Sequence, residues 1–224
     1  MGQDEATGTS WSSYDQSFRE DAHQLLVWGY NDSRHRVTSD LEETEVTGFI
    51  VEAIETKLSA PDMDERFDRY SIKEDNPVPG EGRTGKRRRR MDVIVECTYR
   101  PRHKQRPRYV FEAKRLRRPS HLIGYYVGEE GVRRFVEGKY AADCPEVAMV
   151  GYVQSDTTEY WVGRLEEKFA GDSSGELQIT EELIKVDVIP SLTDEWTSQH
   201  NRRSGTPIVI YHVFLDCSEL STRG

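Results

Sequence analysis

Cysteine and long apolar runs are scarce in this sequence. The 224 residues include three cysteines (Cys97, Cys144 and Cys217), which are far apart and odd in number. No CxxC, HExxH or clustered Cys/His spacing occurs, so the sequence supports neither a disulfide framework nor a zinc site. The apolar runs are far shorter than a membrane span, and residues 1–30 lack the basic start and apolar middle of a signal peptide. We therefore expect a cytoplasmic protein without a membrane partner.

The chain length fits one domain with an ample hydrophobic core. The first residues are small and polar, so we expect a flexible N-terminus over residues 1–14 and a single domain over 15–224. Neither an internal repeat nor a composition shift marks a second domain.

Positive charge is concentrated in one part of an acidic chain. The formal net charge is −9, yet residues 83–118 hold 15 Lys or Arg and only 3 acids. The remaining residues hold 16 Lys or Arg and 37 Asp or Glu. Such a distribution favours binding of a polyanion at one defined place. A solvated basic loop balanced by acidic neighbours is the alternative.

Hydrophobic periodicity predicts alternating helices and strands. Val46, Ile50 and Ile54 recur at helical spacing after a cap at Ser39, where Glu42 occupies the capping-box position. We expect helices at 15–29, 39–58, about 129–141 and, opened by Asp156, 157–170; a Pro/Gly-rich loop at 74–86; and strands at 91–98, 109–114, 147–153, 184–189 and 207–215. This order predicts an α/β (α+β) fold with a central mixed β-sheet flanked by helices.

Three charged residues lie inside two neighbouring strands. Glu112 and Lys114 point to the same face of their strand, and Asp92 begins the preceding one. If the strands pair antiparallel, Asp92 comes beside Glu112, and the two carboxylates repel unless a cation separates them. Hard oxygen ligands suit Mg²⁺, with Mn²⁺ as a substitute, and Lys114 would orient water or stabilise charge on a phosphate.

A further acid is expected from the helix at 39–58. Glu43 falls within the apolar face of this helix, which makes it the first choice for an inward-facing acid beside the metal. The alternative is a first-turn glutamate that the helix dipole favours.

Asp92, nineteen further residues and then Glu112-Ala113-Lys114 resemble the D…(D/E)xK signature of the PD-(D/E)xK, or restriction-endonuclease-like, nuclease superfamily. The resemblance covers about residues 40–153; Met91 stands where the nominal motif has proline. It implies a restriction-endonuclease-like core and Mg²⁺-dependent phosphodiester hydrolysis, with Asp92 and Glu112 as metal ligands and Glu43 as the frequent extra acid. It also suggests an endodeoxyribonuclease in restriction or anti-phage defence.

The arginines around this motif are expected to bind phosphate. They are Arg87, Arg88, Arg89, Arg90, Arg115, Arg117, Arg118 and Arg134. The expected partner is nucleic acid, with DNA preferred. The chain carries no recognisable sequence-reading module, so either a homodimer or a separate partner protein supplies target selection, or there is none. Two other functions stay open: a catalytically inactive nucleic-acid-binding or scaffold subunit with a nuclease-like fold, and a module whose basic region docks an acidic protein.

Overall fold

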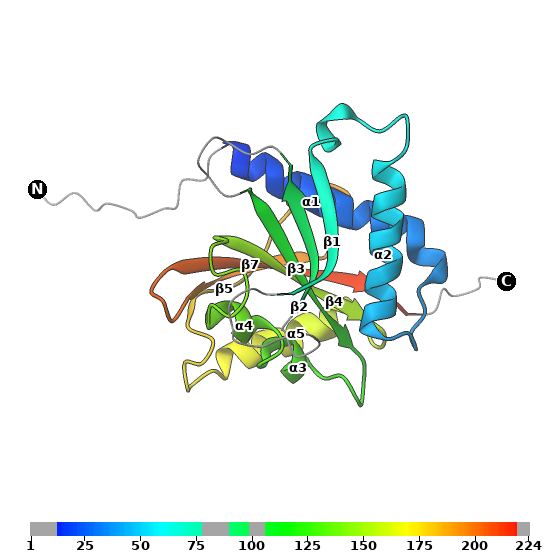
Figure 1. Ribbon diagram of the computed structural model, residues 1–224. Coiled ribbons are helices and arrows are strands. Elements are labelled where there is room, and N and C mark those ends of the chain that lie inside the picture. The colour runs from blue at the N-terminus through cyan, green and yellow to red at the C-terminus, as the bar shows by residue number, and fades with distance from the viewer. Residues whose placement is uncertain (1–12, 78–89, 99–105, 219–224) are drawn as a thin grey trace, which may run out of the picture.

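A seven-stranded mixed sheet forms the centre of the protein. The computed structural model describes residues 13–77, 90–98 and 106–218. Figure 1 shows the sheet, whose strand order is β1-β2-β3-β4-β7-β6-β5. Strands β3, β4 and β7 are parallel neighbours, and the pairs on either side of them are antiparallel. The strands are β1 Tyr70–Pro77, β2 Arg90–Cys97, β3 Arg108–Leu116, β4 Glu146–Val153, β5 Ile179–Lys185, β6 Glu195–Asn201 and β7 Pro207–Asp216.

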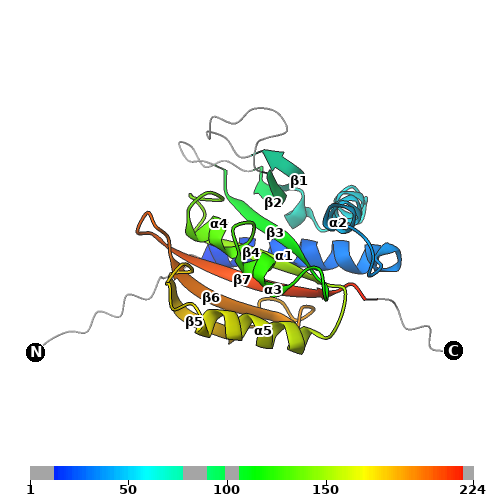
Figure 2. The same ribbon diagram turned by 90° about the horizontal axis from the view of Figure 1, so that it is seen from below.

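Helices cover both faces of the sheet, which confirms the predicted fold class. One core packs the sheet against α1 and α2, and a second packs the opposite face against α3, α4 and α5 (Figures 1 and 2). Among the described residues, no helix is both long enough and apolar enough to cross a bilayer. The helices are α1 Ser13–Ser33, α2 Glu43–Leu58, α3 Ile123–Val127, α4 Val132–Val136 and α5 Thr158–Ala170, with 3₁₀ turns at Arg34–Arg36 and Glu65–Phe67.

Helix α2 packs closely against α1 and thereby takes a fixed position over the sheet. Its buried face carries Val46, Ile50 and Ile54, as the spacing predicts. A Cβ atom on Gly29 of α1 would lie 2.6 Å from the carbonyl oxygen of Ile50, so only glycine allows this approach of the two backbones. The body of α2 is therefore held against α1.

The central strand β4 is buried along its whole length. Its sequence, EVAMVGYV, is almost continuously apolar, as expected for a strand between two parallel neighbours with helices on both faces. Gly151 leaves room for side chains of the neighbouring strands β3 and β7, because a Cβ there would approach side-chain carbons of Leu116 and Phe214 at 2.7 and 3.0 Å.

Two strands are absent from the sequence-based expectation, and one is shifted. Residues 74–77 belong to β1 rather than to a loop, β6 was not predicted, and β5 ends at Lys185 instead of spanning 184–189. The sequence of β6 lacks an apolar pattern because its buried residues include Glu195, Ser198 and His200. Glu195 lies 2.6 Å from Nδ1 of His23, and both side chains are fully buried.

The other polar groups of β6 belong to a buried chain of hydrogen bonds. The carbonyl of Leu177 can only accept, so Nδ1 of His200 carries the hydrogen of that contact and Nε2 accepts from Ser198. The Ser198 oxygen then accepts from Nε2 of His212, and Nδ1 of His212 accepts from the Tyr126 hydroxyl. Burial lowers the pKa of His200 to about 4, which keeps the chain neutral.

Three helix starts differ from the expectation. Within residues 129–141 only Val132–Val136 form a helix, α4: it is preceded by a tight turn in which a Cβ on Gly131 would lie 1.8 Å from the carbonyl oxygen of Tyr126, and it is followed by Gly138 with a φ of 67°. Helix α2 is capped by Glu42 in a capping box with Glu45, not by Ser39. Helix α5 is capped by Thr157, whose hydroxyl accepts from the backbone NH of Tyr160, rather than opened by Asp156.

Candidate active site

The sheet opens between β2 and β3. Their paired residues run from Glu96 opposite Arg108 to Val93 opposite Phe111, and the pairing ends there. Extending the register by one residue sets Asp92 opposite Glu112, on the sheet face that Ile94 and Val110 share. The two strands are therefore antiparallel neighbours, the condition under which the sequence places Asp92 beside Glu112.

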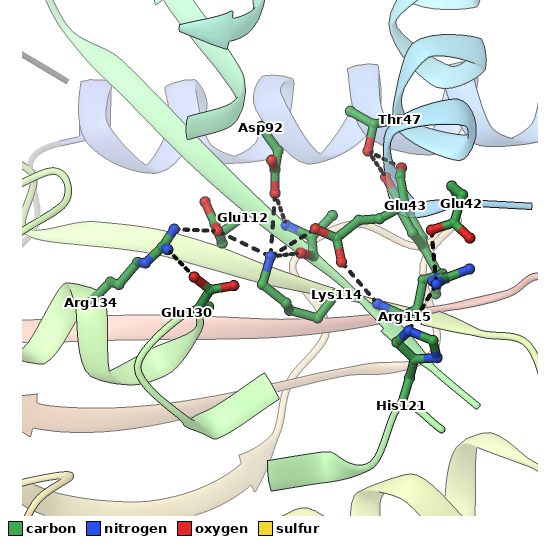
Figure 3. Close-up of polar contacts among 12 residues, drawn as sticks. Glu42, Glu43, Thr47, Asp92, Glu112, Lys114, Arg115, His121, Glu130 and Arg134 are labelled. Atoms are coloured by element: carbon green, nitrogen blue, oxygen red, sulfur yellow. Dashed lines mark hydrogen bonds and ion pairs between the residues drawn. The ribbon is translucent and has the colours of Figure 1, made fainter. Parts of the chain in front are cut away.

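Two carboxylates take the place of a strand beyond this point. The backbone NH of Ala113 donates to Oδ2 of Asp92 at 2.7 Å, and that of Arg115 donates to Oε2 of Glu43 at 3.3 Å. These alternate NH groups of β3 would bond a neighbouring strand if the ladder continued. Glu43, the first residue of α2, and Asp92, near the start of β2, thus meet along the open edge of β3 (Figure 3).

The ammonium of Lys114 lies among three carboxylates from three elements. Its Nζ is 2.9 Å from Oε1 of Glu43, 3.2 Å from Oε1 of Glu112 and 3.9 Å from Oδ2 of Asp92 (Figure 3). It also donates to the carbonyl of Ala113. The Glu112 side chain is 2% exposed and that of Lys114 is 11% exposed. All four residues predicted for the catalytic centre are therefore brought together, and their roles stay predictions.

Burial and mutual repulsion shift the pKa values of these acids upward. Burial, reinforced by the charge of Asp92, raises the pKa of Glu112 to about 8. Burial also raises the pKa of Asp92 to about 6, although the nearby ammonium of Lys114 opposes the shift. Burial tends to lower the pKa of Lys114, but its three carboxylate neighbours outweigh that effect and raise it. Lys114 thus remains a cation at physiological pH.

Arg134 of α4 contacts the other side of Glu112. Its Nη1 is 3.4 Å from Oε1 of Glu112, and its Nη2 is 3.1 Å from Oε1 of the exposed Glu130. The guanidinium also lies over the ring of Tyr140, 4.7 Å from its centroid. The guanidinium of Arg134 therefore contacts both the buried Glu112 and the exposed Glu130 (Figure 3).

Arg115 ties the start of α2 to the sheet. It bonds the carboxylate of Glu42 at 2.9 Å, Nε2 of His121 at 2.8 Å and the carbonyl of Leu41 at 3.1 Å. The same carbonyl accepts from Nε2 of Gln154 at 2.7 Å. Sequence reasoning did not single out Gln154; its only signal was a polar residue directly after a buried strand.

The remaining predicted phosphate-binding arginines are only partly covered by the structure. Arg87–Arg89 lie outside the described residues, and of Arg90 only the backbone, within β2, is described. Arg117 forms a backbone bridge with His121. Arg118 is half-exposed and pairs with Asp156.

The donor set fits a hard divalent cation. Within the described ranges, no three acidic, histidine or cysteine side chains form a group that could hold a metal as they stand. Mg²⁺ typically needs only one or two carboxylates, with water and phosphate oxygens completing its shell. Oε2 of Glu112 is buried and has no hydrogen-bond partner among the described residues, so one carboxylate oxygen remains for such an ion.

The raised pKa of Glu112 predicts a pH-dependent stability. Folded Glu112 binds its proton more tightly than the unfolded chain does, with a pKa of about 8 against the ordinary value of 4.5. In EDTA the free energy of unfolding should therefore fall as pH rises from about 4.5 through 8. The side chain in Glu112→Gln cannot ionise, so this variant should not lose that stability. Its melting temperature should exceed that of the wild type at pH 8 and converge with it near pH 5.

Thermal unfolding between pH 5 and 9 measures this difference. Glu52→Gln, an exposed change on α2, is the matched control and should follow the wild type. Parallel curves for the wild type and Glu112→Gln would contradict the buried, proton-binding state of Glu112.

Comparison with known proteins assigns no family. No family model matches the chain, and no curated protein or solved structure is detectably similar to it. The PD-(D/E)xK resemblance of Asp92, Glu112 and Lys114 therefore remains a prediction from the sequence.

Proposed function

We propose that this protein is a Mg²⁺-dependent nuclease that hydrolyses phosphodiester bonds, with DNA as the expected substrate. The observation that supports this most strongly is the meeting of Asp92, Glu112, Lys114 and Glu43 at the open edge of β3. Restriction and anti-phage defence is the setting that the sequence resemblance suggests for such an enzyme.

Stability alone is a poor explanation for this cluster. Burying charged groups carries a desolvation penalty that their mutual attraction often fails to repay, and apolar side chains in such places are frequently as stable. Here burial raises the pKa of both Asp92 and Glu112; the charge of Glu43 adds to the shift of Asp92, and the charge of Asp92 adds to that of Glu112. Strongly perturbed acids beside a specific charge partner are typical of functional sites.

Asp92 and Glu112 are the residues that would hold the cation, with Glu43 beside them. A bound Mg²⁺, or Mn²⁺ in its place, would stabilise negative charge on a phosphate and make a water molecule more acidic. Glu112 carries a proton at neutral pH in the metal-free protein, because its pKa is about 8. It must release that proton to become a ligand.

Lys114 is suited to stabilise charge rather than to act as a base. Its pKa is raised by the surrounding carboxylates, so it keeps its proton. An ammonium at this position can donate to an oxygen of the substrate phosphate while Glu43 and the Ala113 carbonyl hold its other hydrogens. Glu43 therefore orients Lys114 as well as supplying negative charge.

Divalent-cation binding provides a test that does not depend on activity. We expect Mn²⁺ at ten times its dissociation constant to add about 1.4 kcal/mol to the free energy of unfolding. At pH 7 binding should release protons, which calorimetry in buffers of different ionisation enthalpy measures. Glu112→Gln should lose both effects and Glu52→Gln should keep them; an undiminished effect in Glu112→Gln would contradict the metal assignment.

Cleavage assays test the nuclease directly. Purified protein is incubated with plasmid, linear duplex, single-stranded DNA and RNA in Mg²⁺, Mn²⁺ or EDTA. We expect metal-dependent cutting, and a loss of about a hundredfold or more in Asp92→Ala, Glu112→Ala and Lys114→Ala, because each removes a group at the reacting phosphate.

Binding assays on the same variants separate catalysis from substrate binding. The three alanine variants should still bind the substrate, and Glu52→Gln should cut like the wild type. Cutting that survives in Glu112→Ala would overturn the site. Binding without cutting by the wild type would favour the non-catalytic scaffold.

The basic segment before β2 should supply affinity rather than chemistry. Replacing Arg87–Arg90 by alanine should weaken binding and reduce the slope of log affinity against log salt by about 0.9 for each lost duplex phosphate contact. Cutting at saturating substrate should persist. Titrations of labelled duplex between 50 and 200 mM salt measure the slope, and an unchanged affinity would favour the solvated-loop interpretation.

A further inference from the structure

Helix α3 exposes an apolar and aromatic surface. Its inner side chains Ile123 and Tyr126 are buried, whereas Leu122 is 46% and Tyr125 is 62% exposed. A side chain at Gly124 would meet nothing within 4 Å, so the surface between them is open. Among the described residues none hydrogen-bonds the Tyr125 hydroxyl. We refer to Leu122, Gly124 and Tyr125 as the α3 platform.

The α3 platform is connected to the candidate active site by direct contacts. The ring of Tyr125 lies 6.4 Å from that of His121, and His121 contacts Arg115 at 2.8 Å. The backbone of Arg115 in turn contacts Glu43. Helix α3 also packs on the sheet face that carries Ile94 and Leu116, the face toward which the side chains of Asp92 and Glu112 are directed.

The charge around the α3 platform suits a polyanion. Besides the buried Lys114, residues 113–128 contain Arg115, Arg117, Arg118 and no acidic residue; Arg115 pairs with Glu42, and Glu129 and Glu130 follow this segment. Arg118 is half-exposed, pairs with Asp156 and lies over the ring of Tyr160, 4.9 Å from its centroid. An exposed aromatic ring beside cations is the usual construction of a surface that binds single-stranded nucleic acid.

We propose that the α3 platform stacks an unpaired base of the nucleic-acid strand whose phosphate enters the candidate active site, an inference that rests on the proposed function. Every base has a face that can stack on a tyrosine ring, so the contact selects for unpaired strand rather than for sequence. Bases within a duplex are stacked on one another and cannot offer that face. The enzyme therefore prefers single strands or frayed ends to continuous duplex.

Equilibrium binding in EDTA tests this preference without cleavage. Fluorescence anisotropy is measured with the full chain and three labelled probes of equal length: a single strand, the same strand with abasic sites, and a duplex. We expect Tyr125→Ala to bind the single strand about tenfold more weakly, the loss of one stacked base, and to bind the abasic strand and the duplex like the wild type.

Two further variants serve as controls. Tyr125→Phe keeps the aromatic face and should bind like the wild type. Tyr14→Ala removes a tyrosine that is 40% exposed and stacks on Phe18, whose ring contacts Tyr109 at the opposite end of β3, and should have no effect. Because Tyr125 is largely exposed, its alanine variant should also keep the melting temperature of the wild type.

The outcomes separate this inference from the proposed function. Equal losses of Tyr125→Ala on all three probes, or no loss on the single strand, overturn base stacking. A wild-type dimer in light scattering that Tyr125→Ala dissociates overturns it in favour of contact with a second copy. Duplex cutting without single-strand binding would contradict base stacking on the α3 platform and leave the nuclease proposal supported. Tyr125-dependent single-strand binding without cutting would support base stacking and contradict the nuclease proposal.

Discussion

Beyond Phe111, one edge of β3 has no strand beside it, yet its backbone NH groups still require acceptors because they lie inside the protein. Asp92 and Glu43 meet that requirement with their carboxylates. Two negative charges are thereby placed at the edge, beside the buried Glu112. Lys114 supplies the positive charge that offsets these three carboxylates. The divergence of β2 from β3 thus accounts for the meeting of all four charged side chains.

The position of Glu43 depends on how α2 begins. Helix–helix packing at Gly29 holds the body of α2, while the carbonyl of Leu41 receives hydrogen bonds from Arg115 and Gln154. The backbone of Glu42 is extended, and the helix starts at Glu43 with its side chain toward Lys114. A helix begun at Ser39 would have lacked this link to the sheet.

The sequence predicted the fold class, β2, β3 and β4, and the proximity of Asp92, Glu112 and Lys114, because apolar runs and alternation report burial directly. It missed β6, since a strand whose buried Ser198 and His200 are satisfied by one another lacks an apolar pattern. It missed α3 and made α4 too long, because it did not predict the tight turn in which the backbone of Gly131 approaches that of Tyr126. The hydrogen bond from Gln154 to the carbonyl of Leu41 could not be predicted either, because it joins segments that are far apart in the sequence.

Arg134 and Arg115 each pair with an exposed glutamate, Glu130 and Glu42 respectively. Seen from a distance, such a pair is nearly neutral, so it adds little to the long-range field that speeds the encounter with a polyanion. At contact, a phosphate can take the place of the glutamate as the ion-pair partner of the guanidinium. In the proposed nuclease these two arginines would thus govern how long a bound strand stays rather than how fast it arrives.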